Sequence, residues 1–291
     1  MASMRQIRSR IRVAKNIEQI TKAMKMVAAA RLRRAQDTVI SARPYSQKLR
    51  EVMGRLASSS AGSSGQPLLK PLTAAPKRIG LVLVSGDRGL CGSFNSSAIR
   101  LGMEAVRGFA PADVKVIAVG RRGAAFLRRR GYTIVGEHSI AGAAASFTDS
   151  QAIAESATQL FVDGSVDVVQ LVYTQFVSSM TQRPQSIQLI PVAPPEVSAT
   201  APVERNEVIF EPDAEEILDD LVPKYVETLI FQAVLESSAS FFGAQMTSMS
   251  AATDNAGKMI STLTLSLNRA RQAAITREIA EIVGGADALK G

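Results

Sequence analysis

Apolar residues recur every three or four positions along the first part of the chain. This spacing is typical of one face of an α-helix. The stripe consists of Ile7, Ile11, Ala14, Ile17, Ile20, Met24 and Val27. We therefore predict a helix over residues 1–57, with a kink near Arg43, because Pro44 lacks an amide hydrogen and disturbs a helix interior.

Between residues 77 and 196, short apolar runs alternate with segments of helical pattern. Buried strands are predicted at Ile79–Ser85, Val114–Gly120, Tyr132–Gly136, Val166–Thr174 and Ser186–Val192. Helices are predicted between the first four, at Ser96–Arg107, Arg122–Arg130 and Asp149–Asp163. This alternation is typical of a mostly parallel sheet covered by helices. The segment 176–185 is too short for a crossover, so the last two strands are expected to form an edge hairpin.

Residues 211–291 return to a helical pattern, interrupted only by Pro223. Small and apolar residues there follow the heptad spacing of a coiled coil. The predicted seam is Met249, Ala252, Ala256, Met259, Leu263, Ser266, Ala270 and Ala273. Linkers at 58–76 and 197–210 separate the two helices from the middle segment. The predicted fold class is α/β, a long antiparallel coiled coil of the N- and C-terminal helices with a central five-stranded Rossmann-like α/β domain.

The two predicted helices differ in length. At a rise of 1.5 Å per residue, the first would measure about 80 Å and the last about 110 Å. The end of the last helix would therefore extend beyond its partner, although Ile275, Ile279 and Ile282 make it apolar. We expect another protein to enclose this end, since a large exposed apolar patch marks an interaction site.

Positive charge is concentrated at the N-terminus. The chain carries a net charge of +8, but residues 1–57 hold 14 Lys or Arg against 3 Asp or Glu, a net +11 that leaves −3 elsewhere. Such a segment needs an acidic partner surface, which could be nucleic acid, anionic lipid or an acidic protein groove. No apolar run approaches the roughly 18 residues of a membrane-spanning helix.

The sequence offers little catalytic chemistry. Gly86–Gly92 (GDRGLCG) follows the first predicted strand, where nucleotide-binding folds place their phosphate loop, but its G-x-x-G-x-x-G spacing matches neither common phosphate motif. We interpret it as a tight turn. Cys91, the only cysteine, is expected to be a packed side chain, and His138, the only histidine, to lie in an unrelated loop. We therefore predict no catalytic, cofactor-binding or metal-binding residues. The acidic helix start is interpreted as complementing the helix dipole, although a metal site there stays open; it comprises Asp213, Glu215, Glu216, Asp219 and Asp220.

Four motifs along the chain resemble the gamma subunit of the F-type rotary ATP synthase. They are ITKAMKMVAAARLRRAQD (20–37), SGDRGLCGSFN (85–95), EPDAEEILDDLVPKYVE (211–227) and ATDNAGKMISTLTLSLNRARQAAITREIAEIVGGA (252–286). The resemblance implies a non-catalytic rotor shaft that couples proton flow to ATP synthesis, with ATP chemistry left to the beta subunits. The implied partners are the ring of alpha and beta subunits, the epsilon subunit and the membrane c ring, with one copy of this chain per complex.

The resemblance also implies contact residues on the helices. Met24 and Lys25 match the region that meets an acidic lever segment of beta, and Arg271 and Gln272 match a pair that hydrogen-bonds a catch loop of beta. The tip that turns in the apolar bearing of the ring is matched by Ile275, Thr276, Ile279 and Ile282. Met24 and the isoleucines are also compatible with ordinary coiled-coil core positions, so both roles stay open.

Arg31, Arg33 and Arg34 match the membrane end, where they would face polar loops of the c ring. One segment departs from the family, because Ser240-Phe241-Phe242-Gly243-Ala244 replaces a polar Ser-Glu-(His/Gln)-Ala stretch. Its contacts are therefore not implied by the resemblance. The regulatory cysteine pair of chloroplast-type chains is absent as well, so no thiol switch within the chain is expected.

The resemblance starts within the first residues, which favours a bacterial chain at the cytoplasmic face of the inner membrane over an organelle-encoded one. Membrane association is expected only through the complex, and no nucleic acid is expected as a partner. Two alternatives stay open. A basic coiled-coil scaffold or nucleic-acid-binding protein would show steeply salt-dependent DNA affinity, and a Rossmann-like enzyme would bind ATP or NAD.

Overall fold

The computed structural model describes residues 4–59, 65–70, 72, 74–139, 146–193 and 214–288. The chain divides into two units, a smaller one of residues 1–28 with 246–291 and a larger one of residues 29–245. The predicted linker 197–210 lies outside the described residues, as do residues 60–64, 71 and 73 of the predicted linker 58–76. No helix in the described part is long and apolar enough to cross a membrane.

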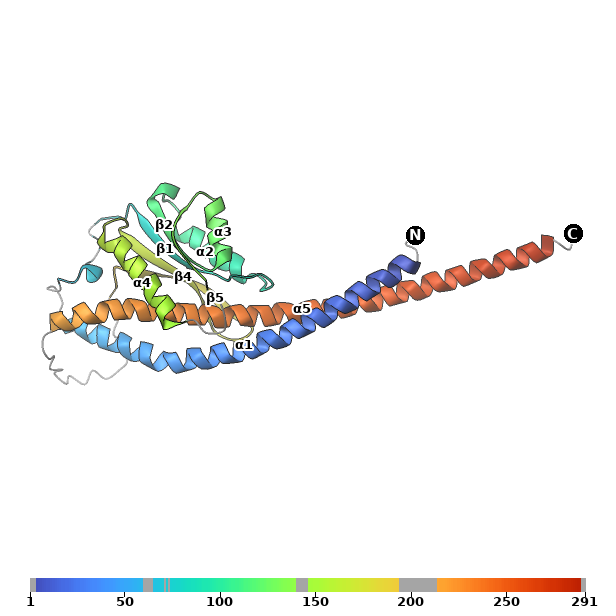
Figure 1. The fold of residues 1–291 in the computed structure, drawn as a ribbon, viewed down its shortest axis with the longest axis horizontal. Coiled ribbons are helices and arrows are strands. Elements are labelled where there is room, and N and C mark those ends of the chain that lie inside the picture. The colour runs from blue at the N-terminus through green and yellow to red at the C-terminus, as the bar shows by residue number, and fades with distance from the viewer. Residues whose placement is uncertain are drawn as a thin grey trace. The chain divides into compact units, whose positions relative to one another are not determined.

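The larger unit contains a five-stranded sheet (Figure 1). The strands are β1 (Ile79–Val84), β2 (Val114–Val119), β3 (Thr133–His138), β4 (Val168–Phe176) and β5 (Gln182–Ile190). Their order is β3-β2-β1-β4-β5, and all neighbours are parallel except β4 and β5. The predicted α/β class and the edge hairpin are confirmed. Strand β5 begins earlier than predicted, because the hairpin closes in a tight turn at Ser178–Thr181, where two backbone hydrogen bonds form.

Alternate strand residues supply two cores, one on each face of the sheet. Helices α2 (Phe94–Ala105) and α3 (Arg121–Arg129) cover one face, where Leu81 and Leu83 of β1 are buried. Helix α4 (Phe147–Val162) and parts of α1 (Met4–Ser59) and α5 (Ala214–Ala288) cover the other, where Val82 of β1 is buried. The inner strands β1 and β2 are therefore buried on both faces, as parallel sheets require. Strand β3, predicted to be buried, has no buried residue, because it lies at the edge of the sheet.

Both long helices continue through their prolines. Helix α1 is uninterrupted at Pro44, and α5 is uninterrupted at Pro223. A proline leaves the carbonyl four residues earlier without its usual helical donor. For Pro223 that carbonyl belongs to Asp219, and the side-chain amide of Gln66 donates to it at 3.4 Å and to the Asp219 carboxylate at 3.1 Å. The segment before β1 thus compensates for the proline.

In the smaller unit, the start of α1 and the end of α5 run antiparallel. Thr253 Oγ1 donates to Thr21 Oγ1 at 2.8 Å, and Lys25 Nζ donates to Ser250 Oγ at 3.0 Å. A Cβ on Gly257 would lie 3.6 Å from a carboxylate oxygen of Glu18. Because the partner's residue number falls as the α1 number rises, these contacts fix one antiparallel register.

The buried stripe of α1 differs from the predicted one. Every seventh residue is buried, at positions 7, 14, 21 and 28. Ile17, Ile20 and Val27 instead have exposed fractions of 47%, 59% and 53%. Of the other predicted residues, Ile7 and Ala14 are buried and Ile11 and Met24 are half-buried, as predicted, so two stripes with the same spacing overlap and spacing alone cannot choose between them. The helix pair selects the one that places Thr21 opposite Thr253, where two small side chains hydrogen-bond.

The predicted seam of α5 is partly right. Met249 and Ala256 are buried and Ala252, Leu263 and Ala270 are half-buried, as predicted, but Met259 is 57% exposed. After Ala256, the inward-facing residues between the shared positions lie one place later than predicted, at Ile260, Leu267 and Ala274. Ser266 and Ala273 are exposed. From residue 275 to 285 every residue is exposed, which agrees with an unpaired, apolar helix end.

Candidate functional site

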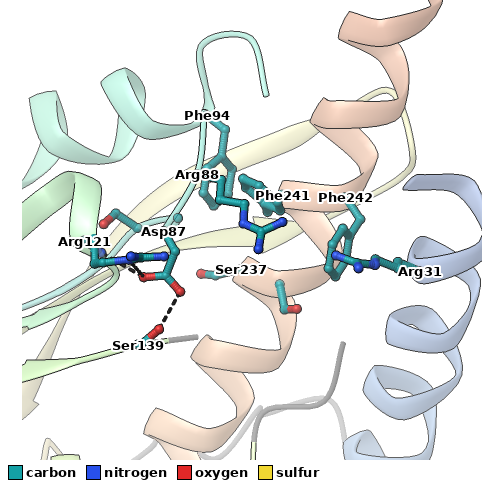
Figure 2. A pocket seen from close by; sticks show the side chains of 12 residues that line it. Arg31, Asp87, Arg88, Phe94, Arg121, Ser139, Ser237, Phe241 and Phe242 are labelled. Atoms are coloured by element: carbon teal, nitrogen blue, oxygen red, sulfur yellow. Dashed lines mark hydrogen bonds and ion pairs between the residues drawn. The ribbon is translucent and has the colours of Figure 1, made fainter. Parts of the chain in front are cut away.

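The strand order reverses between β1 and β4, because the chain leaves β1 toward β2 on one side and β4 lies on the other. In open α/β sheets, ligands bind at such a point, beyond the carboxyl ends of the strands. A cavity of about 200 Å³ lies here (Figure 2). Its lining comes from α1, the segment after β1, the first residues of α2 and α3, the residue after β3, and α5; it comprises Arg31, Ser85, Gly86, Asp87, Arg88, Phe94, Arg121, Ser139, Ser237, Ser238, Phe241 and Phe242.

The N-terminus of α3 is saturated by the segment that follows β1. The amide of Arg121 donates to Asp87 Oδ1 at 3.0 Å, and the amide of Gly123 donates to Ser85 Oγ at 2.9 Å. The amide of Arg122 donates to the Gly86 carbonyl at 3.1 Å. Nucleotide-binding folds keep helix N-terminal amides available for phosphate. At α3 these three amides already have acceptors within the chain.

The segment after β1 approaches α3 so closely that a glycine is required. Gly120 has φ +99°, and a Cβ there would lie 2.0 Å from the Ser85 carbonyl oxygen. On the other side of the turn, Asp87 accepts a hydrogen bond from Ser139 Oγ at 2.7 Å and lies 3.6 Å from Arg121 Nε. The GDRGLCG segment is thus a hydrogen-bonded turn, as predicted, and its carboxylate is already engaged.

Helix α5 closes the crevice at β4. Strand β1 pairs with β4 only as far as Val172, so the backbone of Thr174 has no strand partner on that side. Ser237 Oγ accepts a hydrogen bond from the Thr174 amide at 3.0 Å, and Ser240 Oγ donates to the Thr174 carbonyl at 3.1 Å. Thr174 and both serines are buried. Two hydroxyls of α5 therefore complete an open strand end.

Aromatic side chains fill the adjoining part of the crevice. A Cβ on Gly86 would lie 2.9 Å from Phe241 Cε2, so the ring lies directly against the backbone of the turn. Phe241 also makes edge-to-face contacts with Phe94 and Phe242, and the Arg31 guanidinium lies over the Phe242 ring (Figure 2). The position that usually holds a ligand is largely occupied by the protein's own helix.

The two residues considered for nucleophilic chemistry have separate surroundings. Cys91 is buried, as predicted; burial raises the pKa of its thiol, and the hydrogen bond from Asn95 Nδ2 at 3.2 Å opposes this only in part. His138 is the last residue of β3 rather than a loop residue, which corrects the prediction. Burial lowers the pKa of His138, although the Asp149 carboxylate acts in the opposite direction. Within the described ranges, no three His, Cys, Asp or Glu side chains gather as a metal site.

The predicted contact residues on the helices are mostly accessible. In the smaller unit, Met24 is half-buried, while Arg271 and Gln272 are exposed. Lys25 is exposed along its side chain, but its ammonium group is bonded to Ser250. The tip residues are all exposed; they are Ile275, Thr276, Ile279 and Ile282.

In the larger unit, Arg33 and Arg34 are exposed, whereas Arg31 contacts Phe242. The sequence did not predict that Ser237 and Ser240 would complete β4, because single serines in a helix give no signal. Phe241 and Phe242 stood out in the sequence only as a departure from the family. Two adjacent aromatics in that polar stretch were the signal that could have predicted a buried contact.

Comparison with known proteins places the chain in a family. The family model described as ATP synthase matches residues 3–289. The ATP synthase gamma chain of Desulfitobacterium hafniense is 49% identical over 290 residues, and that of Pelotomaculum thermopropionicum is 47% identical over 290 residues; each match covers 100% of both chains. The chain therefore belongs to the family of ATP synthase gamma chains.

Solved structures agree with this assignment. A chain in the central stalk and c-ring structure of the Tetrahymena thermophila mitochondrial ATP synthase matches with a TM-score of 0.59 and 25% identity, over 80% of this chain and 99% of that chain. A chain in the Euglena gracilis mitochondrial ATP synthase structure of OSCP, F1 and c-ring matches with a TM-score of 0.69, over 98% and 94% of the two chains. At 18% identity the second match shows the fold alone.

Proposed function

We propose that this chain is the central rotor shaft of an F-type ATP synthase. It transmits torque between the membrane c ring and the ring of alpha and beta subunits, and so couples proton translocation to ATP synthesis. The observation that carries this proposal is the match to gamma chains over the full length of both chains. Membership of the family supports one copy per complex and the epsilon subunit as a further partner.

The helix pair of the smaller unit supports a role inside a protein ring. Its apolar end is exposed from residue 275 onward, and α1 carries a second exposed apolar stripe at Val13, Ile17, Ile20 and Val27. Exposed apolar surface of this extent marks an interaction site. We assign the tip Ile275, Thr276, Ile279 and Ile282 to the apolar bearing of the ring.

Polar contacts complete the proposed interface with the beta subunits. Arg271 and Gln272, both exposed, offer a planar guanidinium and an amide that suit backbone and carboxylate acceptors. Met24 and Lys25 would meet the acidic lever segment of beta, with Lys25 held in place by Ser250. In the larger unit, the exposed Arg33 and Arg34 would face the c ring; the resemblance implies the same for Arg31, whose guanidinium lies over the Phe242 ring.

We further propose that the chain has no catalytic activity of its own. The crevice in which α/β folds bind ligands is largely occupied by α5 and by the turn after β1, so ATP chemistry would belong to the beta subunits. We place the chain at the cytoplasmic face of a bacterial inner membrane, held there through the complex. Isolated chain is accordingly expected to bind neither ATP nor NAD in equilibrium dialysis.

Co-expression with the alpha and beta subunits of the same organism tests the proposal. We expect one copy of this chain to elute with each ring on size-exclusion chromatography, and ATPase activity to exceed that of rings without it. Truncation after Leu267 would remove the tip and should weaken coupling between hydrolysis and pumping. Absence of co-elution would reject the rotor assignment, and salt-dependent DNA binding by the chain would then favour a nucleic-acid-binding scaffold.

Single substitutions test the individual contacts. Arg271→Ala should lower the coupled ATPase rate of the assembled complex by removing a bidentate donor. Arg277→Ala is the matched control, because Arg277 is also exposed on the same stretch of α5 and lies outside the proposed contact set. Equal effects of the two substitutions would contradict the assignment of Arg271 and leave only a general requirement for positive charge.

A further inference from the structure

A continuous series of side-chain contacts joins α1, α5 and the start of α2 in the larger unit. The Arg31 guanidinium lies 5.9 Å from the centre of the Phe242 ring. Phe242 and Phe241 meet edge to face at 5.4 Å between ring centres, and Phe241 and Phe94 do so at 5.6 Å. We call these four residues the aromatic stack; Figure 2 shows them extending from α1 across α5 to the domain.

The stack is firmly seated at its inner end. Phe94 and Phe242 are buried, with exposed fractions of 6% and 4%. Phe241 lies against the backbone at Gly86, where even a methyl group would collide with its ring. At the outer end, Arg31 is exposed and is placed over the ring by its contact with Phe242. A cation above an aromatic face and edge-to-face rings are both attractive and directional.

The position of the stack along the two helices gives it a particular role. The larger unit comprises residues 29–245, so Arg31 lies within the first turn of α1 in this unit and Phe242 within the last turn of α5. The hydrophobic core that holds α5 ends earlier, at Val234. Beyond that core, the serine contacts with Thr174 and the aromatic stack fix α5 to the domain. The stack thus fastens the first turn of α1 and the last turn of α5 in this unit to the domain, beside the contact of Gly243 with the β4–β5 hairpin.

We propose that Arg31, Phe241 and Phe242 are positioning residues that clamp these outermost turns of α1 and α5 to the sheet domain, so that turning force passes between the domain and the helices without local slippage. The inference rests on the proposed rotor function. It gives Arg31 an internal partner in place of the c-ring contact that the resemblance implies. It also explains the departure from the family at Phe241-Phe242-Gly243. The two rings belong to the stack, and a glycine follows them because a Cβ at position 243 would lie only 3.3 Å from the Ser179 carbonyl oxygen.

Hydrogen exchange of the full chain tests the clamp directly. Arg31→Met keeps the approximate length of the side chain but removes the cation. Loss of such a contact shifts the equilibrium between the packed and the locally opened end of α5 about two- to fivefold toward the opened state. We expect amides of α5 around residues 238–245 to exchange faster by that factor. Arg33→Met, an exposed neighbour on α1, and Arg130→Met, which removes the guanidinium 5.2 Å above Phe126, are matched controls and should leave these amides unchanged.

A functional measurement separates positioning from stability. In complexes assembled in membrane vesicles, we expect Arg31→Met and Phe241→Leu to retain ATP hydrolysis but to pump fewer protons for each ATP hydrolysed. Arg130→Met, which lies outside every proposed partner contact, should pump as the unchanged chain does. If Arg31→Met and Arg33→Met reduce pumping equally, a charge contact with the c ring explains Arg31 and the clamp is refuted. Unchanged exchange and pumping in Arg31→Met would refute it as well. Failure of the unchanged chain to join the ring would instead reject the rotor function.

Discussion

Replacing Ser237 by alanine tests whether α5 completes the open end of β4. The hydroxyl of Ser237 is the acceptor for the Thr174 amide at 3.0 Å, and the two residues have exposed fractions of 1% and 2%. Ser237→Ala removes the acceptor without adding volume. The amide of Thr174 then lies buried without the acceptor that Ser237 supplied.

The cost follows from that geometry. A buried donor left without its acceptor costs about 1–3 kcal/mol, whereas the hydrogen bond itself contributes only about 1 kcal/mol net. In a domain of this size each kcal/mol lowers the melting temperature by about 2–4 °C. Ser240→Ala, which strips the donor from the Thr174 carbonyl, should cost less, because a carbonyl oxygen tolerates a missing partner better than an amide does.

Urea unfolding of the full chain measures the effect. Ser237→Ala should lower the midpoint with an unchanged slope, since the surface exposed on unfolding stays the same. Ser238→Ala is the matched control: Ser238 is a buried neighbour that lines the cavity, and we expect its removal to lower the midpoint less than Ser237→Ala does. If Ser237→Ala unfolds at the midpoint of Ser238→Ala, the Thr174 amide has another acceptor and α5 does not seal the crevice.

Three further predictions follow from single contacts. Burial tends to raise the pKa of Asp167, but hydrogen bonds from Lys77 and Arg78 outweigh it and hold that pKa below its usual value. The ionised Asp167 carboxylate therefore stabilises the fold above pH about 4, and this stabilisation is lost as the pH falls through the folded pKa. Asp167→Asn should lower the urea midpoint at neutral pH and make the midpoint depend less on pH in the acid range. The Cys91 thiol, buried and with a raised pKa, should react with iodoacetamide far more slowly in the folded chain than in urea, and a fast native rate would contradict its burial. Gly120→Ala should lower the free energy of unfolding by at least about 3 kcal/mol, because its Cβ would meet a backbone oxygen at 2.0 Å and its φ is positive. Gly164→Ala is the control, since φ is also positive there but the space is open. Comparable urea midpoints for the two variants would refute the close approach at Gly120.

The sheet domain was predictable because its strands are short, apolar and bounded by turn residues. The runs around Ile79 and Val114 have little freedom to be anything other than buried strands, and their alternation with helices fixes a parallel sheet. The length of segment 176–185 predicted the hairpin for a simple reason: a crossover does not fit. These inferences use local chain geometry, which the sequence contains.

The helix pair was less predictable, because its outcome depends on which surface meets which. Both stripes of α1 have helical spacing. Thr21 is buried and Ile20 is not because Thr21 hydrogen-bonds Thr253, which lies 232 residues further along the chain. The same holds for the crevice: Ser237 and Phe241 matter only because α5 returns to the end of β4. No local pattern records that return, so these residues could be found only in the folded chain.

The second apolar stripe of α1 has a consequence for the chain before it meets any partner. One side of α1 packs against α5. Another side exposes an apolar stripe that consists of Val13, Ile17, Ile20 and Val27. In the absence of a partner, two copies of the chain can bury these stripes by associating with each other, and the associated fraction grows as the concentration rises. A cell that makes this chain in excess of the proteins that cover it would therefore accumulate aggregates. Balanced synthesis is a requirement that follows from this helix.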